Sequence, residues 1–147
     1  MRILAIDLGM ARTGLAICDA TEMLASPLET INQYYSEKLL QKVVDVVATQ
    51  KPELIVVGHP RNMDGTCGES AKRAEDFAEK LEAATDIKTV LWDERMTTVT
   101  AIGYLNETNV RGKKRKSVVD TVAATIILQD YLNHRRLQRE KDAEKAD

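Results

Sequence analysis

Three carboxylates occupy positions from which they can form one acidic site. Asp7 ends an apolar run, Glu94 follows another, and Asp120 lies near the start of an apolar segment close to the C-terminus. Carboxylates that are brought together repel each other, so such a cluster is stable where a cation lies between them. Oxygen ligands of this kind favour Mg²⁺ or Mn²⁺. The chemistry that such a site serves is in-line hydrolysis of a phosphodiester bond, with Asp7, Glu94 and Asp120 as catalytic metal ligands.

Each of these acids also has an ordinary structural interpretation. Asp7, close to Gly9 at a strand end, is typical of a turn. Glu94 can equally be a solvated loop residue paired with its neighbour Arg95. Asp120 stands three residues after a serine, in a capping-box pattern, where the acid would stabilise the start of a helix. Capping is compatible with metal binding, because the helix dipole keeps the carboxylate ionised.

A basic segment stands out against a chain with a net charge of −2. Residues 111–116, RGKKRK, contain five bases and no acid. The segment is either a solvated charged loop or a flexible grip for phosphates beside the acidic site. Only six residues are aromatic, so no base-stacking platform is evident. The residues predicted to contact nucleic acid are Arg12, Arg61, Arg95, Arg111, Lys113, Lys114, Arg115 and Lys116.

His59, Cys18 and Cys67 are the other residues with versatile chemistry. His59 can act as a general base, but a single histidine in a loop is more often structural or exposed. Neither cysteine has a partner at metal-ligand spacing. A disulfide or zinc framework is therefore not predicted, and the cysteine pattern fits the reducing cytoplasm.

The elements that must position these residues belong to one domain. The chain has 147 residues, of which 44% are hydrophobic and 30% charged, a balance typical of a soluble domain with a single core. No apolar run is long enough to span a membrane. We expect one domain over residues 1–134 and a charged, frayed tail over residues 135–147.

The pattern of apolar runs predicts an α/β fold with a mixed five-stranded sheet. RILAIDL and TGLAIC form a hairpin, and MLASPLETI adds a third antiparallel strand, placed at the sheet edge by Pro27. A helix capped by Ser36 and ending before Pro52 leads to ELIVVG, which is typical of a buried parallel strand. A second amphipathic helix leads to the last strand, IKTVLW. A short helix over about 97–106 and a closing apolar helix, SVVDTVAATIILQDYL, complete the pattern.

The order of the strands determines where the acids meet. Right-handed crossovers place the strand that ends at Gly58 beside the first strand, and the strand that ends at Trp92 beyond it. The carboxyl ends of these three parallel strands then share one edge, where ligands bind in open α/β sheets. Asp7 and Glu94 are expected at that edge, and Asp120 joins them if the closing helix packs nearby.

Four motifs, in this order and spacing, resemble the YqgF family, also called RuvX. They are ILAIDLGMARTGLAI, VVGHPRNMDGT, WDERMTT and VDTVAATIILQDYL, and the resemblance covers about residues 2–132. It implies an RNase H-like fold, related to the RuvC resolvases, and a metal-dependent nuclease. Members have been described as Holliday-junction resolvases and are now assigned to maturation of the 5′ end of 16S ribosomal RNA.

The resemblance also carries the family's acidic site onto Asp7, Glu94 of the DER motif and Asp120 of the VD-x-x-AA motif. The sequence departs from the family pattern at Met10, where threonine is common, and at His59 and Arg61, where apolar residues are common. None of the three acids is lost.

Three functions fit these observations. The leading one is a nuclease that cuts structured RNA, with precursor rRNA as its partner. The second keeps the same site but acts on four-way DNA junctions. The third is a non-catalytic nucleic-acid-binding module, which the retention of all three acids disfavours.

Overall fold

Eight elements, arranged around one five-stranded sheet, form the described part of the chain. The structure is a computed structural model that describes residues 1–60, 64, 67–94 and 112–146, with residues 112–121 and 145–146 described by their backbone alone. The elements are β1 (Ile3–Asp7), β2 (Arg12–Cys18), β3 (Ala25–Asn32), α1 (Glu37–Gln50), β4 (Leu54–His59), α2 (Glu69–Thr85), β5 (Thr89–Asp93) and α4 (Gly112–Ala146). The strands lie in the order β3-β2-β1-β4-β5.

The antiparallel half of the sheet is the predicted meander. β1 pairs with β2 so that Asp7 lies opposite Gly14, and β2 pairs with β3. The connecting turn requires a glycine at position 9, because a Cβ atom there would lie 2.1 Å from the carbonyl oxygen of Arg12. Pro27 lies in the edge strand β3, as predicted, where a proline is tolerated because one side of the strand has no partner.

The parallel half also has the predicted order, with β1 beside β4 and β4 beside β5. The helix between β3 and β4 begins after Ser36, whose side chain accepts a hydrogen bond from the backbone N–H of Leu39. It ends at Gln50, and its C-cap residue Lys51 directly precedes Pro52. These caps account for the predicted limits of α1.

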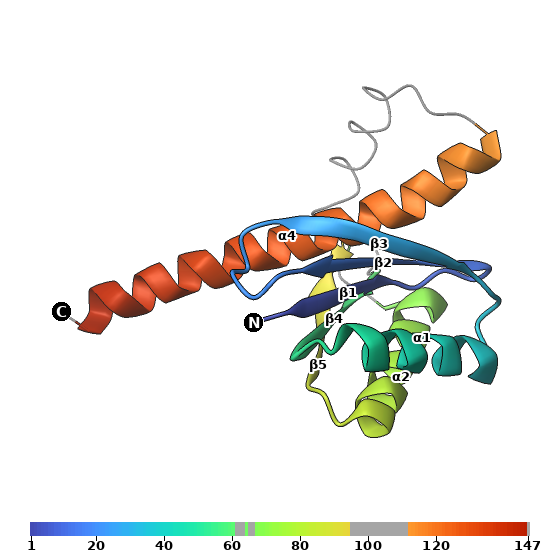
Figure 1. Cartoon of the computed structure of the whole chain (residues 1–147), viewed down its shortest axis with the longest axis horizontal. Coiled ribbons are helices and arrows are strands. Elements are labelled where there is room, and N and C mark those ends of the chain that lie inside the picture. The colour runs from blue at the N-terminus through green and yellow to red at the C-terminus, as the bar shows by residue number, and fades with distance from the viewer. Residues whose placement is uncertain (61–63, 65–66, 95–111, 147) are drawn as a thin grey trace.

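Helices cover both faces of the sheet (Figure 1). α1 and α2 pack on one face, where Leu4, Ile6 and Phe77 are among the buried residues. α4 crosses the other face and extends beyond the sheet (Figure 1), packing Ile127 and Leu128 against the opposite side of the same strands. The alternation of side chains along each strand supplies both cores, which is why the central strands are apolar throughout.

The course of α4 corrects two expectations. The basic segment is helical from Gly112 onward rather than a loop, and the predicted frayed tail continues the helix to Ala146. Lysine, arginine, glutamate and alanine favour helices, so both charged segments extend the helix that the apolar stripe anchors. The short helix expected over 97–106 lies outside the described residues. Within the described ranges, none of the helices has the length and apolar character needed to cross a bilayer.

An almost buried carboxylate attaches α4 to the turn before β3. Glu22, whose side chain is 6% exposed, lies 2.7 Å from Arg135 and 2.9 Å from the N-terminal ammonium group. Burial raises the pKa of Glu22, but the hydrogen bonds from Arg135 and the N-terminus outweigh this effect and hold its pKa below the usual value. The ion pair thus fixes α4 relative to the sheet.

Candidate active site

The carboxyl ends of β1, β4 and β5 meet at one edge of the sheet. The last residues of these strands are Asp7, His59 and Asp93, and Glu94 follows directly. Because side chains alternate between the two faces of a strand, Asp7 and Gly58 belong to the face that α4 covers, whereas His59 belongs to the face of α1 and α2. The edge therefore carries a carboxyl group on the face that α4 covers and an imidazole on the face of α1 and α2.

Gly58 makes room for the carboxyl group of Glu94. A Cβ atom on Gly58 would lie 2.7 Å from both Cδ and Oε1 of Glu94, and 2.9 Å from Cδ1 of Ile127. The carboxyl group of Glu94 thus lies directly on the backbone of β4, between the sheet and α4. Any side chain at position 58 would displace it.

Asp7 and Glu94 form a partly buried, hydrogen-bonded carboxyl pair. Burial raises the pKa of Asp7, and the hydrogen bond from Glu94 acts in the opposite direction. Burial also raises the pKa of Glu94, to about 9, with further contributions from the negative charge of Asp7, their hydrogen bond and the charge of Asp93. At neutral pH Glu94 therefore keeps its proton and donates the hydrogen bond that Asp7 accepts.

Two of the three predicted acids are thus brought into contact, which excludes the solvated-loop interpretation of Glu94. Asp120 lies in α4, and its side chain is outside the described part of the chain. Its backbone position is four residues before Ala124 and seven before Ile127, which share the buried helix face. The capping-box interpretation of Asp120 is wrong, because α4 begins at Gly112, two turns earlier.

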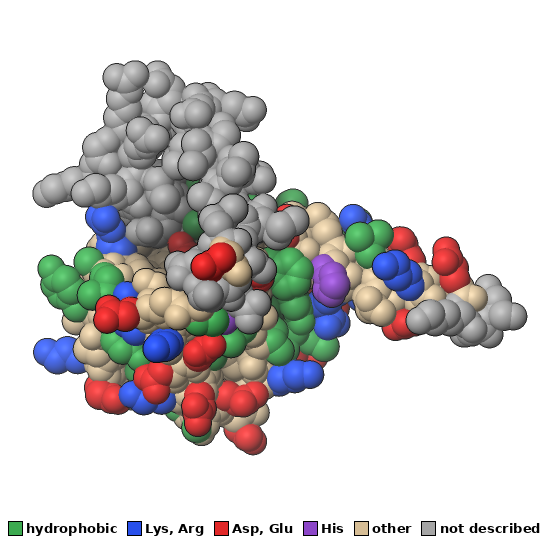
Figure 2. All heavy atoms as spheres, turned by 180° about the vertical axis from the view of Figure 1, so that it is seen from behind, with side chains coloured by type: hydrophobic (Ala, Val, Ile, Leu, Met, Phe, Trp, Pro, Cys, Tyr) green, Lys and Arg blue, Asp and Glu red, His purple; other side chains and the backbone are tan. Residues whose placement is uncertain are grey.

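The predicted nucleic-acid contacts are described only in part. Arg12 begins β2, two residues before Gly14, which lies opposite Asp7 in the sheet. Lys113, Lys114, Arg115 and Lys116 belong to the first turns of α4. Arg61, Arg95 and Arg111 lie outside the described residues. Acidic and basic side chains are interspersed over the described surface that Figure 2 displays.

His59 is buried rather than exposed. Its side chain is 7% exposed, and Nε2 lies 3.1 Å from Oε1 of Glu75 in α2. This partner and the placement of His59 on the face away from Asp7 and Glu94 favour the structural interpretation over a general base. Neither Glu75 nor Gly58 emerged from the sequence as a site residue. The lone glycine at the end of the apolar strand LIVVG was the available indication of close packing at Gly58.

Comparison with known proteins identifies the family. The sequence matches the family described as "RuvX: Holliday junction resolvase" over residues 1–134. The chain belongs to the RuvX family. The predicted resemblance is therefore confirmed, as is the predicted enzyme class, a nuclease that acts on phosphodiester bonds.

Curated relatives extend over nearly the whole chain. A protein of Halothermothrix orenii is 42% identical over 134 residues, covering 91% of this RuvX chain and 96% of the relative. A protein of Protochlamydia amoebophila is 45% identical over 141 residues, covering 91% and 94% respectively. Both carry the name "Putative pre-16S rRNA nuclease".

Solved structures confirm the RNase H-like fold. The fowlpox virus Holliday junction resolvase superposes with a TM-score of 0.56 at 14% identity, covering 91% of the RuvX chain and 99% of the viral protein. RuvC of T. thermophilus, in complex with a Holliday junction substrate, gives a TM-score of 0.54 at 14% identity and covers 86% and 91%.

Proposed function

We propose that this protein is a metal-dependent endonuclease that hydrolyses phosphodiester bonds in structured RNA and matures the 5′ end of the 16S rRNA precursor. The observation that carries the proposal is the partly buried, hydrogen-bonded contact between Asp7 and Glu94 at the carboxyl edge of the sheet. Family membership alone would allow a protein that binds nucleic acid without cutting it. Two carboxyl groups held in contact lower the stability of the fold, and they also repel the phosphates of a nucleic acid. A protein that only binds nucleic acid gains nothing from such a pair, whereas a metal-dependent catalytic site requires it.

The carboxyl pair fits a hard divalent cation. Asp7 and Glu94 provide oxygen donors alone, and burial raises the pKa of each carboxyl group. A cation between them would replace the shared proton and remove the repulsion between two carboxylates. Oxygen ligands favour Mg²⁺ or Mn²⁺ over softer ions. We assign Asp7, Glu94 and Asp120 as the residues that hold it.

The chain's own residues then have separate tasks. Asp7 and Glu94 lose the shared proton on forming the site and remain fixed by the packing of Gly58 and Ile127 around Glu94. Arg12 and the basic residues at the start of α4 bind phosphates of the substrate backbone without reading sequence. When bound, Mg²⁺ or Mn²⁺ supplies activation of a water nucleophile and stabilisation of the leaving oxygen.

Precursor rRNA is favoured as substrate by the curated relatives, which match along nearly their full length and are named for that activity. The likeness to the two resolvases is at 14% identity and supports the fold rather than a junction substrate. Ribosomal RNA processing also implies a location in the cytoplasm. Four-way DNA remains the alternative substrate.

The test compares the two substrates directly. The full chain is incubated with precursor 16S rRNA and with a synthetic four-way junction, each with Mg²⁺, with Mn²⁺ and with EDTA. We expect metal-dependent cleavage of the RNA, and loss of at least about 1,000-fold in Asp7→Asn and Asp120→Asn. Asp45→Asn, on α1 across the sheet, is the matched control and should retain activity.

Three outcomes would contradict the proposal. Cleavage that continues in EDTA or in Asp7→Asn would refute the metal site. Cleavage of the junction alone would show that the protein is a resolvase. Tight binding of RNA without cleavage under any of these conditions would favour a binding module.

A further inference from the structure

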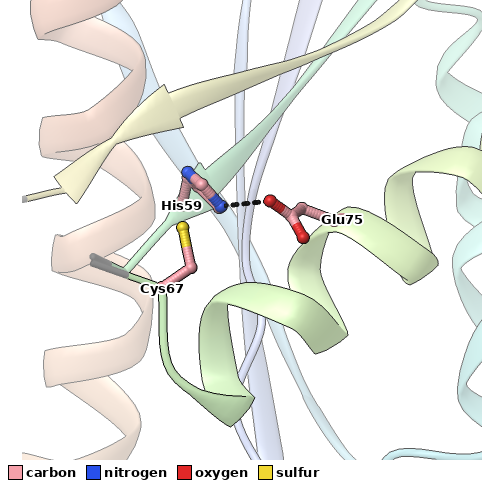
Figure 3. A group of neighbouring side chains, drawn as sticks. All are labelled: His59, Cys67 and Glu75. Atoms are coloured by element: carbon pink, nitrogen blue, oxygen red, sulfur yellow. Dashed lines mark hydrogen bonds and ion pairs between the residues drawn. The ribbon is translucent and has the colours of Figure 1, made fainter. Parts of the chain in front are cut away.

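A second cluster of chemically versatile side chains lies on the other face of the sheet, over α2 (Figure 3). His59, Cys67 and Glu75 each offer one ligand atom, and these atoms all lie within 4.8 Å of one another. Imidazole, thiol and carboxyl are therefore directed toward a common point. Nε2 of His59 already lies 3.1 Å from Oε1 of Glu75, a separation close to that of two ligands on one small ion.

The three ligands come from three different parts of the fold. His59 is the last residue of β4, Cys67 directly precedes the N-cap residue Gly68 of α2, and Glu75 lies in α2 itself. The imidazole is 7% exposed, whereas the carboxylate is 45% exposed, so the cluster opens toward solvent on the side of Glu75. The buried imidazole would provide a fixed ligand, and the exposed carboxylate would leave a path by which an ion can enter from solvent.

We propose that His59, Cys67 and Glu75 form a site for a Zn²⁺-class ion. The chemistry of the donors distinguishes it from the Asp7–Glu94 pair: nitrogen and thiolate sulfur favour Zn²⁺ and Co²⁺, whereas oxygen donors alone favour Mg²⁺. Charge also balances, because one thiolate and one carboxylate neutralise a divalent cation beside a neutral imidazole. Three protein ligands leave one tetrahedral position for water or another ligand.

The site would join α2 to the end of β4. His59 is adjacent to Gly58, on whose backbone the carboxyl group of Glu94 rests. An ion that holds His59, Cys67 and Glu75 together thus fixes the strand end that supports Glu94. Binding should stabilise the folded chain by mass action, since the unfolded chain does not hold the three ligands together.

The experiment uses Co²⁺ as a spectroscopic probe and Zn²⁺ as its competitor, on the full chain under reducing conditions and with excess Mg²⁺ to occupy oxygen sites. We expect a thiolate-to-cobalt charge-transfer band in the near ultraviolet, which one equivalent of Zn²⁺ abolishes. Zn²⁺ binding should release a proton from the thiol, measurable by calorimetry in buffers of different ionisation enthalpy. Neither readout depends on nuclease activity.

Matched variants identify the ligands. Loss of an outer partner of a metal site costs about 10–100-fold in affinity, so loss of a direct ligand in Cys67→Ala should weaken Zn²⁺ binding by at least about 100-fold and remove the band. Glu75→Gln should weaken binding by about 10-fold or more. Cys18→Ala removes the other thiol, and Glu79→Gln removes a carboxylate one turn further along α2. Both controls should bind as the parent does.

The proposal is overturned if the parent shows no charge-transfer band, if the band persists in Cys67→Ala, or if Zn²⁺ affinity is equal in all variants. Circular dichroism of each variant excludes unfolding as the cause of a lost band. Cys67 and Glu75 are only partly buried, so their substitution should leave the fold intact.

Discussion

Glu94→Gln should change how the stability of the metal-free protein depends on pH. Glu94 has a pKa of about 9 in the folded chain, against an ordinary value of 4.5, because it is buried beside Asp7. The folded state therefore keeps a proton that the unfolded chain releases above pH 4.5, and its stability falls by about 1.4 kcal/mol per pH unit until the folded group also titrates. At pH 7 this penalty is about 3 kcal/mol.

Glutamine has the shape of the protonated carboxyl group, donates the same hydrogen bond to Asp7 and does not titrate. The variant should therefore match the parent near pH 4.5 and exceed its free energy of unfolding by about 3 kcal/mol at pH 7. The assay is urea unfolding followed by circular dichroism at several pH values between 4.5 and 9, with EDTA present throughout.

Adding excess Mg²⁺ at pH 7 should stabilise the parent and leave the variant nearly unchanged, since the variant lacks a ligand. Glu79→Gln, an exposed substitution on α2, should follow the pH profile of the parent. If the curves of Glu94→Gln and the parent are parallel over this range, Glu94 does not hold a proton against Asp7 and the proposed site is wrong.

Three further predictions test other parts of the structure. Gly58→Ala should still fold, at a cost of about 1–3 kcal/mol in the free energy of unfolding, but should lower turnover by about 100-fold. The new Cβ atom would lie 2.7 Å from the carboxyl group of Glu94 and would push that group out of its place. Unchanged turnover with precursor RNA would contradict this packing. Glu22→Gln should lower the free energy of unfolding by about 1–3 kcal/mol at pH 7, because it weakens the pair with Arg135. Since the pKa of Glu22 is lowered by folding, this difference should disappear as the pH falls below 4.5, and chemical unfolding at pH 3 and 7 checks it. Alanine at the four basic residues of 113–116 should flatten the slope of log affinity against log salt concentration by about one to two units. The change is smaller than four phosphate contacts would give, because consecutive helix positions spread around the axis and do not all face one substrate. Equal slopes would mean that other residues bind the substrate phosphates.

The sheet was predictable because its rules are local and few. Each strand is a short apolar run, Pro27 excludes an interior position for its strand, and the handedness of crossovers fixes the order of the parallel strands. The same rules predict that Asp7 and Glu94 lie at one edge of the sheet, because Asp7 ends β1 and Glu94 directly follows β5. Their burial was not predictable, because it depends on α4 covering that edge and on the missing side chain at Gly58.

The predicted start of the closing helix is wrong for a physical reason, since α4 begins at Gly112. The sequence of residues 111–116 predicts a loop because it contains Gly112 and no apolar residue to anchor a helix. Repulsion between like charges on a helix opposes this extension by only about 0.2–0.5 kcal/mol per pair. Lysine and arginine have high intrinsic helix propensity, and Ala124, Ile127 and Leu128 anchor the helix to the sheet. Propagation from an anchored helix needs no new nucleus, so the charged segment extends it. This extension removes the capping role of Asp120, whose part in the proposed metal site stays a prediction.

The cluster of His59, Cys67 and Glu75 could not be predicted from the sequence, because the known spacings of metal ligands apply to ligands that share one turn or one helix. Here the spacing is eight residues twice, but the three residues belong to β4, to the segment before α2 and to α2, so no single strand or helix period relates them. The ligands meet because β4 ends at the point where α2 packs, with Cys67 at the junction between them. A strand that alternates its faces thus places adjacent residues, Gly58 and His59, beside the two proposed sites. If both proposals hold, the alternation that builds two cores also separates oxygen donors for a hard cation from nitrogen and sulfur donors for a softer one.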